Sequence, residues 1–144
     1  MAMERSIDID ISSAGTLAEP DAPATDGAIL AGRKFGIDLS NHLSRPVTSD
    51  LIDSTSLVLC MERHHVMDLV TQHRADLAVV FSLAELARRA VQEPARSPTE
   101  TLDDWLGRLG DGRSAASVLS GHRDDIADPI GRSNRMYRSA AREI

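Results

Sequence analysis

An aspartate followed by a proline is the feature of this sequence best suited to acid–base chemistry. Asp128 directly precedes Pro129, and a second carboxyl group, that of Asp125, lies three residues earlier. Proline biases the residue before it toward an extended backbone, so the Asp128 carboxyl can project into a cleft. An Asp-Pro pair is also an ordinary turn signal. Taken alone, the pair leaves a proton-donating site and a plain surface turn as alternatives.

The single cysteine does not have the surroundings of a nucleophile. Phosphoryl transfer through cysteine needs a thiolate, amides at a helix N-terminus and an arginine that grips the phosphate. Cys60 lies inside an apolar run, residues 57–61, and opens no glycine-rich turn. We expect it to be a small buried hydrophobe. One cysteine also excludes an intramolecular disulfide and a multi-thiolate metal site.

The histidines do not predict a metal site. His64 and His65 are adjacent on an expected helix, where their side chains diverge by about 100°. His73 and His122 have no partners at ligand spacing, and no glycine-rich nucleotide motif is present. We therefore expect no metal ion and no cofactor.

Three motifs, taken in order, resemble the low-molecular-weight protein tyrosine phosphatase family. They are Ser13-Ala14-Gly15-Thr16, the segment at residues 36–45, and the segment at residues 125–129. The sequence at residues 128–131 and at residues 81–87 is similar to a bacterial branch of that family. The resemblance covers most of the chain and is weakest between residues 93 and 122.

The resemblance implies roles for four residues. Asp128 matches the general acid that protonates the leaving oxygen, and Asp125 matches the nearby acid of the same segment. Ser13 and His42 match residues that support the phosphate-binding loop through hydrogen bonds. Each also has a structural alternative, because Ser13 can cap a turn and His42 can be an exposed loop residue. Ile130 stands where many members carry an aromatic residue that lines the phosphotyrosine pocket.

The family's reactive loop has no counterpart in the sequence. Members use a cysteine and an arginine six positions later, in a loop before the first of the three motifs, whereas Cys60 is followed six positions later by Val66. We expect residues 1–144 to form one family-like domain, truncated at its N-terminus and inactive as it stands. A non-catalytic interaction protein, an arsenate-reductase-like relative and an unrelated small α/β protein are the alternatives.

Composition bounds the partners and the compartment. The chain has 144 residues, a hydrophobic share of 42% and a net charge of −6. These values suit one globular domain and argue against sequence-independent binding to nucleic acid. No apolar stretch is long enough to span a bilayer and the N-terminal residues do not resemble a secretory signal, so we expect a cytoplasmic protein. With a restored loop, its partner would be a phosphorylated protein or a small phosphomonoester.

Apolar patterning predicts a parallel sheet. Isoleucine alternates with aspartate over residues 7–11, and continuous apolar runs occupy residues 57–61 and 77–81. Alternation is typical of a half-exposed strand, and continuous runs are typical of strands covered on both faces. Because helical patterns separate these segments, we expect a three-layer α/β/α fold. The resemblance implies the family's sheet, with its central first strand missing.

Capping residues mark the expected helices. One begins at Thr25 or Asp26 and ends before Gly36, and another runs through residues 65–70. Two open with the box patterns Ser82 to Glu85 and Ser97 to Glu100, the second closing at Gly110. The last begins at Ser133 or Asn134. Residues 111–125 carry no clear signal.

Overall fold

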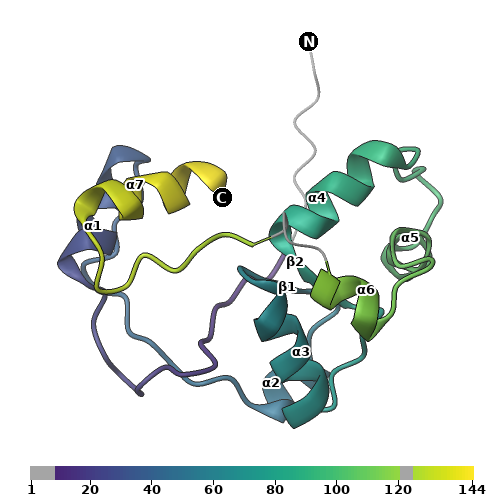
Figure 1. Ribbon diagram of the computed structural model, residues 1–144, viewed down its shortest axis with the longest axis horizontal. Coiled ribbons are helices and arrows are strands. Elements are labelled where there is room, and N and C mark those ends of the chain that lie inside the picture. Colours follow the sequence, from purple (N-terminus) through teal and green to yellow (C-terminus); the bar gives the residue numbers. More distant parts are fainter. Residues whose placement is uncertain (1–8, 121–124) are drawn as a thin grey trace.

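The computed structural model describes residues 9–120 and 125–144. Figure 1 shows its elements in chain order. They are α1 (Asp26–Lys34), α2 (Ser49–Asp53), β1 (Val58–Cys60), α3 (Arg63–Gln72), β2 (Val80–Ser82), α4 (Leu83–Gln92), α5 (Leu102–Leu109), α6 (Ala115–Ser120) and α7 (Asn134–Glu143). In Figure 1, α1 and α7 lie side by side at one end, and the two strands lie at the other end with α2 to α6.

The two strands pair in parallel, as the apolar runs predict. Val58 pairs with Val80 and Cys60 with Ser82, and α3 makes the crossover between them. The second strand begins later than expected, because residues 77–79 form a turn. In that turn the Asp76 carboxylate accepts a hydrogen bond from the Ala78 amide at 2.9 Å.

The strand predicted at residues 7–11 is wrong for its described part. Residues 9–11 have no strand pairing, and the side chains of Ile9 and Ile11 are 62% and 82% exposed. Ile7 lies outside the described residues. Alternating residues form a strand only where a neighbouring backbone offers hydrogen bonds. Here the first backbone pairing comes later, where Gly15 forms a parallel bridge with Pro46.

Most helix boundaries follow the capping signals. The Thr25 hydroxyl accepts a hydrogen bond from the Ala28 amide, and Gly36 adopts a positive φ of 75° after the helix ends. The box at Ser97 to Glu100 forms, yet it closes a turn rather than opening α5. That helix begins at Leu102 with Thr101 as its cap, so this boundary was predicted too early.

The core contains two clusters, one on each face of the sheet, and successive residues of β2 point into them. Val80 faces one side of the sheet and Phe81 the other, since side chains alternate along a strand, and both are fully buried. Each face is covered by helices, which confirms the expected α/β fold. The Val80 cluster contains Ile52, Cys60, Val66, Leu69, Ala75 and Val118, and the Phe81 cluster contains Leu86, Leu106 and Leu109.

A buried ion pair joins β2, α4 and the loop that follows α5. Glu85 is 5% exposed, and its carboxylate accepts hydrogen bonds from Arg113 Nε at 2.9 Å and Arg89 Nε at 3.0 Å. The Arg113 side chain, 2% exposed, also donates to the backbone carbonyls of Leu77 and Val80. Its guanidinium stacks 3.8 Å from the ring centre of Phe81.

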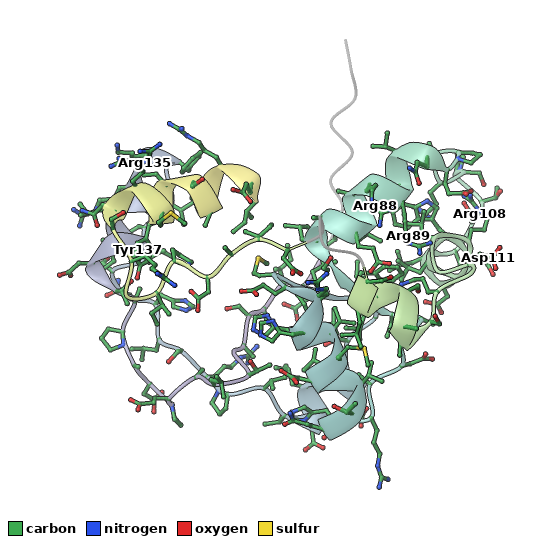
Figure 2. The ribbon with its side chains drawn as sticks, viewed as in Figure 1. Arg88, Arg89, Arg108, Asp111, Arg135 and Tyr137 are labelled. Carbon is green, nitrogen blue, oxygen red and sulfur yellow. The ribbon has the colours of Figure 1, made fainter. Side chains whose placement is uncertain are left out.

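Helices α1 and α7 meet through a tyrosine that lies on a glycine. The Thr25 hydroxyl donates to the Tyr137 hydroxyl at 3.1 Å, and a Cβ atom on Gly27 would lie 2.6 Å from the Tyr137 ring. Figure 2 shows Tyr137 at this junction. Glycine at this position permits close approach of the two helices.

We predict that Arg113→Met destabilises the fold by about 3 kcal/mol or more, because Glu85 loses most of its compensation while remaining buried. Urea unfolding followed by circular dichroism measures the change. Arg108→Met, which removes a solvent-screened pair with Glu100, is the control and should cost clearly less. Equal losses in the two variants would contradict a special role for the buried pair.

We predict that Gly27→Ala destabilises the protein by about 1 kcal/mol or more, because overpacking against the rigid Tyr137 ring outweighs the better helix propensity of alanine. Gly107→Ala in α5 is the matched control, since no atom lies within 4 Å of its added Cβ. The control should be neutral or stabilising by up to about 1 kcal/mol. Thermal unfolding of the two variants compares them directly.

Candidate active site

The Asp-Pro segment is fastened to the carboxyl end of β1. The Ile126 amide donates to the Met61 carbonyl at 2.8 Å, and the Ile126 side chain is buried. Met61 directly follows β1, so residues 125–131 pass the end where that strand meets α3. Ligands in parallel α/β folds bind at the carboxyl ends of the strands.

Asp125 caps the N-terminus of α3. Glu62, the residue at the cap position, makes no side-chain capping bond. Instead, Asp125 Oδ1 accepts a hydrogen bond from the Arg63 amide at 2.7 Å, and Asp125 Oδ2 lies 3.3 Å from Arg63 Nε. The carboxylate thus satisfies an amide at the positive end of the helix.

Asp128 lies three residues further along, on an exposed turn. The Asp128 amide donates to the Glu62 carboxylate at 3.2 Å, and Asp128 Oδ1 accepts from the Ile130 amide at 2.9 Å. Gly131 completes the turn with a φ of 70°. The turn is therefore anchored through its backbone, and Asp128 itself is exposed to solvent.

Glu62 is the site residue that sequence reasoning missed. One oxygen of its carboxylate holds the Asp128 amide, and the other lies 3.3 Å from His64 Nδ1. No local pattern marks Glu62, because its partner follows 66 residues later. A glutamate just before a helix reads only as a favourable charge near the helix N-terminus.

Ser13 and His42 lie on a separate pair of segments. Arg45 Nε donates to the Ser13 carbonyl at 2.8 Å, and the Gly15 amide donates to the Arg45 carbonyl. The side chains of Ser13 and His42 are exposed. Within residues 9–120 and 125–144, no hydrogen bond or ion pair joins them to Asp125 or Asp128. The structure therefore groups the two aspartates together, and the supporting roles of Ser13 and His42 stay predictions.

Cys60 is buried in the core, as predicted. It is 7% exposed and packs in the Val80 cluster with Val66. Burial raises the pKa of its thiol to about 12, and the negative charge of Asp68 adds to the shift. A protonated, enclosed thiol is a poor nucleophile.

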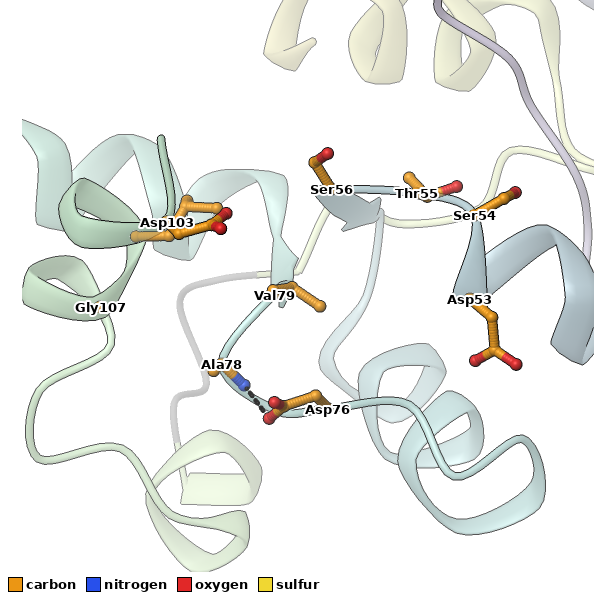
Figure 3. Close-up of a pocket in the computed structure, with 10 residues that line it drawn as sticks. Asp53, Ser54, Thr55, Ser56, Asp76, Ala78, Val79, Asp103 and Gly107 are labelled. Carbon is orange, nitrogen blue, oxygen red and sulfur yellow. Dashed lines mark hydrogen bonds between the residues drawn. The ribbon is translucent and has the colours of Figure 1, made fainter. Parts of the chain in front are cut away.

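A hollow of about 470 Å³ lies at the opposite end of the strands. Figure 3 shows Asp53, Asp76 and Asp103 among its lining residues. Ser56 and Val79, which also line it, come shortly before β1 and β2, so the hollow adjoins the amino ends of the strands. Three carboxylates would repel a phosphate group, and we do not assign this hollow to the site.

Two further observations concern metals and membranes. Among the residues that the structure describes, no three His, Cys, Asp or Glu side chains gather as a metal site would require. In the same part of the chain, no helix has the length and apolar character needed to cross a bilayer.

Comparison with known proteins identifies the family. The sequence profile of the low molecular weight phosphotyrosine protein phosphatases matches residues 1–109. A protein-arginine-phosphatase of Bacillus subtilis (strain 168) is 34% identical over 144 residues, which are all of this chain and 74% of the relative. A probable low molecular weight protein-tyrosine-phosphatase, EpsP of Ralstonia nicotianae, is 26% identical over 107 residues, 74% of each chain.

A solved structure agrees with the sequence matches. The crystal structure of a YwlE mutant from Bacillus subtilis superimposes with a TM-score of 0.59 at 25% identity, covering 90% of this chain and 66% of the other. The chain thus spans about three quarters of these curated relatives and about two thirds of the solved chain. It belongs to the low molecular weight phosphotyrosine protein phosphatase family.

Proposed function

We propose that this chain takes part in hydrolysing phosphate from phosphorylated protein side chains, with Asp128 as the general acid. The observation that carries the proposal is the placement of Asp128. Its turn is exposed and is anchored through Glu62 beside the carboxyl end of β1. The matches to named phosphatases support the same reaction class.

In this reaction Asp128 would donate a proton to the leaving group, a step that its exposed position allows. In the family, a cysteine thiolate attacks phosphorus, a sulfur–phosphorus bond forms, and the bond from phosphorus to the leaving atom breaks. The proton from Asp128 passes to that leaving atom. Water then attacks phosphorus and gives a proton to the resulting carboxylate, and the sulfur–phosphorus bond breaks to release phosphate and the thiolate. Asp125 acts indirectly, because its contact with the Arg63 amide fixes the segment that carries Asp128.

Residues 1–144 contain no cysteine suited to the nucleophilic role. Cys60 is enclosed, and position 66, six residues later, is the buried Val66 rather than a phosphate-binding arginine. We propose that these 144 residues alone do not turn over phosphomonoesters. In that state they would act as a non-catalytic interaction protein. Ser13 and His42 would support a phosphate-binding loop where one is present.

Phosphoarginine is a second candidate substrate class. A relative that aligns with the whole chain is named a protein-arginine-phosphatase. Ile130, which follows the Asp-Pro pair, offers no aromatic ring to stack on a phosphotyrosine. Phosphotyrosine and phosphoarginine hydrolysis both need a proton donor for the leaving group. The acid therefore does not distinguish the two substrates, and an activity assay with each is required.

We predict that joining a family strand, Cys-x5-Arg loop and helix ahead of residue 9 produces hydrolysis of a phosphotyrosine peptide. Asp128→Asn in this chimera should lower kcat by about 10²–10⁴-fold, the usual contribution of a general acid. The loss should be smaller with p-nitrophenyl phosphate, whose leaving group needs less protonation. A phosphoarginine peptide, assayed in parallel, identifies the preferred substrate.

The 144-residue chain is the control for the chimera. It should release no p-nitrophenol above the level of its Cys60→Ser variant, because the thiol is buried and protonated. Turnover by the chain that Cys60→Ser abolishes would contradict the enclosed thiol. An active chimera that is insensitive to Asp128→Asn on phosphotyrosine would contradict the acid assignment.

We predict that Asp125→Ala lowers the free energy of unfolding by about 1–2 kcal/mol, because the N-terminus of α3 loses its capping oxygen. Asp125→Asn, which keeps one oxygen, should recover part of the loss. Asp128→Asn is the matched control and should stay within about 0.5 kcal/mol of the parent. Denaturant unfolding that ranks Asp128→Asn as the worse variant would refute the division of roles.

A further inference from the structure

Three arginines form one face of α7. Arg135, Arg138 and Arg142, together with Ser139, line a hollow of about 290 Å³. We call these three arginines the α7 arginine row. Figure 2 labels Arg135 at the end of the molecule that holds α1 and α7. The spacing of three and four residues places all three side chains on the same side of the helix.

The row carries positive charge that the described part of the protein does not neutralise. None of the three guanidinium groups lies within 4 Å of a described carboxylate, although other arginines, such as Arg89 and Arg113, form ion pairs with Glu85. Glu143 is nearby in sequence, and its carboxylate lies 3.4 Å from the Ser139 hydroxyl. The chain as a whole has a charge of −6, so the row is a local exception.

The opposite face of α7 is occupied. Tyr137 lies on Gly27 and bonds with Thr25 of α1, and Ala140 and Ala141 are half-buried. Membrane-surface helices insert an apolar face into lipid, and here that face is turned toward α1. Arg135 and Arg142 are exposed and Arg138 is half-buried, so a ligand can reach the arginine row from solvent. The exposed large apolar side chains of this segment, Met136 and Ile144, do not form a continuous apolar face along the helix.

We propose that the α7 arginine row binds an extended acidic segment of a partner protein. A helix rises 1.5 Å per residue, so the three positions are separated by about 4.5 Å and about 6 Å along the axis. Alternate side chains of an extended peptide lie about 6.6 Å apart, which lets successive carboxylates meet successive guanidinium groups. Each guanidinium can bind a carboxylate through two parallel hydrogen bonds.

Other anions fit less well. A small ion would meet only one or two members of a row that extends over about 10 Å. Nucleic acid requires a broad basic surface, and the net charge of −6 repels a long polyanion. The proposal goes beyond the phosphatase reaction and does not depend on Asp128 or on a nucleophile.

The test is binding of a fluorescein-labelled peptide in which five glutamates alternate with serine, followed by anisotropy at low ionic strength. We expect saturable binding that weakens as salt is added. R138Q/R142Q should weaken binding about fivefold or more, since each exposed charge pair contributes modestly. R138K/R142K should retain part of the affinity, because lysine keeps the charge and loses the forked geometry.

A matched variant separates the row from net charge. K34Q/R74N removes two positive charges from exposed positions outside the row, and asparagine tolerates the positive φ of Arg74. It should change binding less than twofold. Equal weakening by both double variants, with unchanged thermal unfolding, would overturn the proposal. Absence of peptide binding would also overturn it. The same holds if the protein binds a peptide with glutamine in place of glutamate, single-stranded DNA or phosphatidylserine vesicles as tightly as it binds the acidic peptide.

Discussion

The buried charge of Glu85 is the constraint on which the packing of the two strands, α4 and α5 depends. A carboxylate removed from water requires full compensation, and two arginines supply it by donating hydrogen bonds to Glu85. Backbone carbonyls accept hydrogen bonds from further N–H groups of these arginines. Arg113 reaches β2 and α4 from a loop beyond α5, and it covers Phe81 at the same time. The network therefore fixes the position of α4 and α5 against the sheet, in a chain with few aromatic residues to fill its core.

Asp128, the candidate acid, lies outside any helix or strand, so its position depends on the strands to which its turn is attached. Asp128 lies on a turn, and two hydrogen bonds from backbone amides hold that turn at the junction of β1 and α3. The Asp128 amide donates to the Glu62 carboxylate, and the Ile126 amide donates to the Met61 carbonyl. Two carboxylates stabilise that junction, each on the other's segment. Asp125 accepts a hydrogen bond from the first amide of α3, and Glu62, at the cap position of α3, accepts one from the turn. The Glu85 network supports β2, β2 pairs with β1, and β1 ends where the turn is anchored.

Local signals in the sequence predicted local structure well. Thr25 and Ser82 cap helices as their positions indicate, and the two apolar runs contain the two strands. The strand over Ile9 and Ile11 was wrong because alternation cannot reveal whether a pairing partner exists. The Arg113 network and the Asp125 cap could not be predicted, because they join residues 28 and 62 positions apart through side chains of ordinary type. For the site, the motifs singled out Asp128 and Asp125, but not Glu62, which holds the Asp128 amide.

The long reach of the Asp125 cap has a consequence for biosynthesis. β1 and α3 leave the ribosome well before the segment that closes over them, since chains emerge from the N-terminus. Until residues 125–131 arrive, the first amides of α3 face water, and the junction that positions the acid is incomplete. A stalled or C-terminally shortened product would thus contain both strands and most of the core residues while lacking Asp128, the candidate acid.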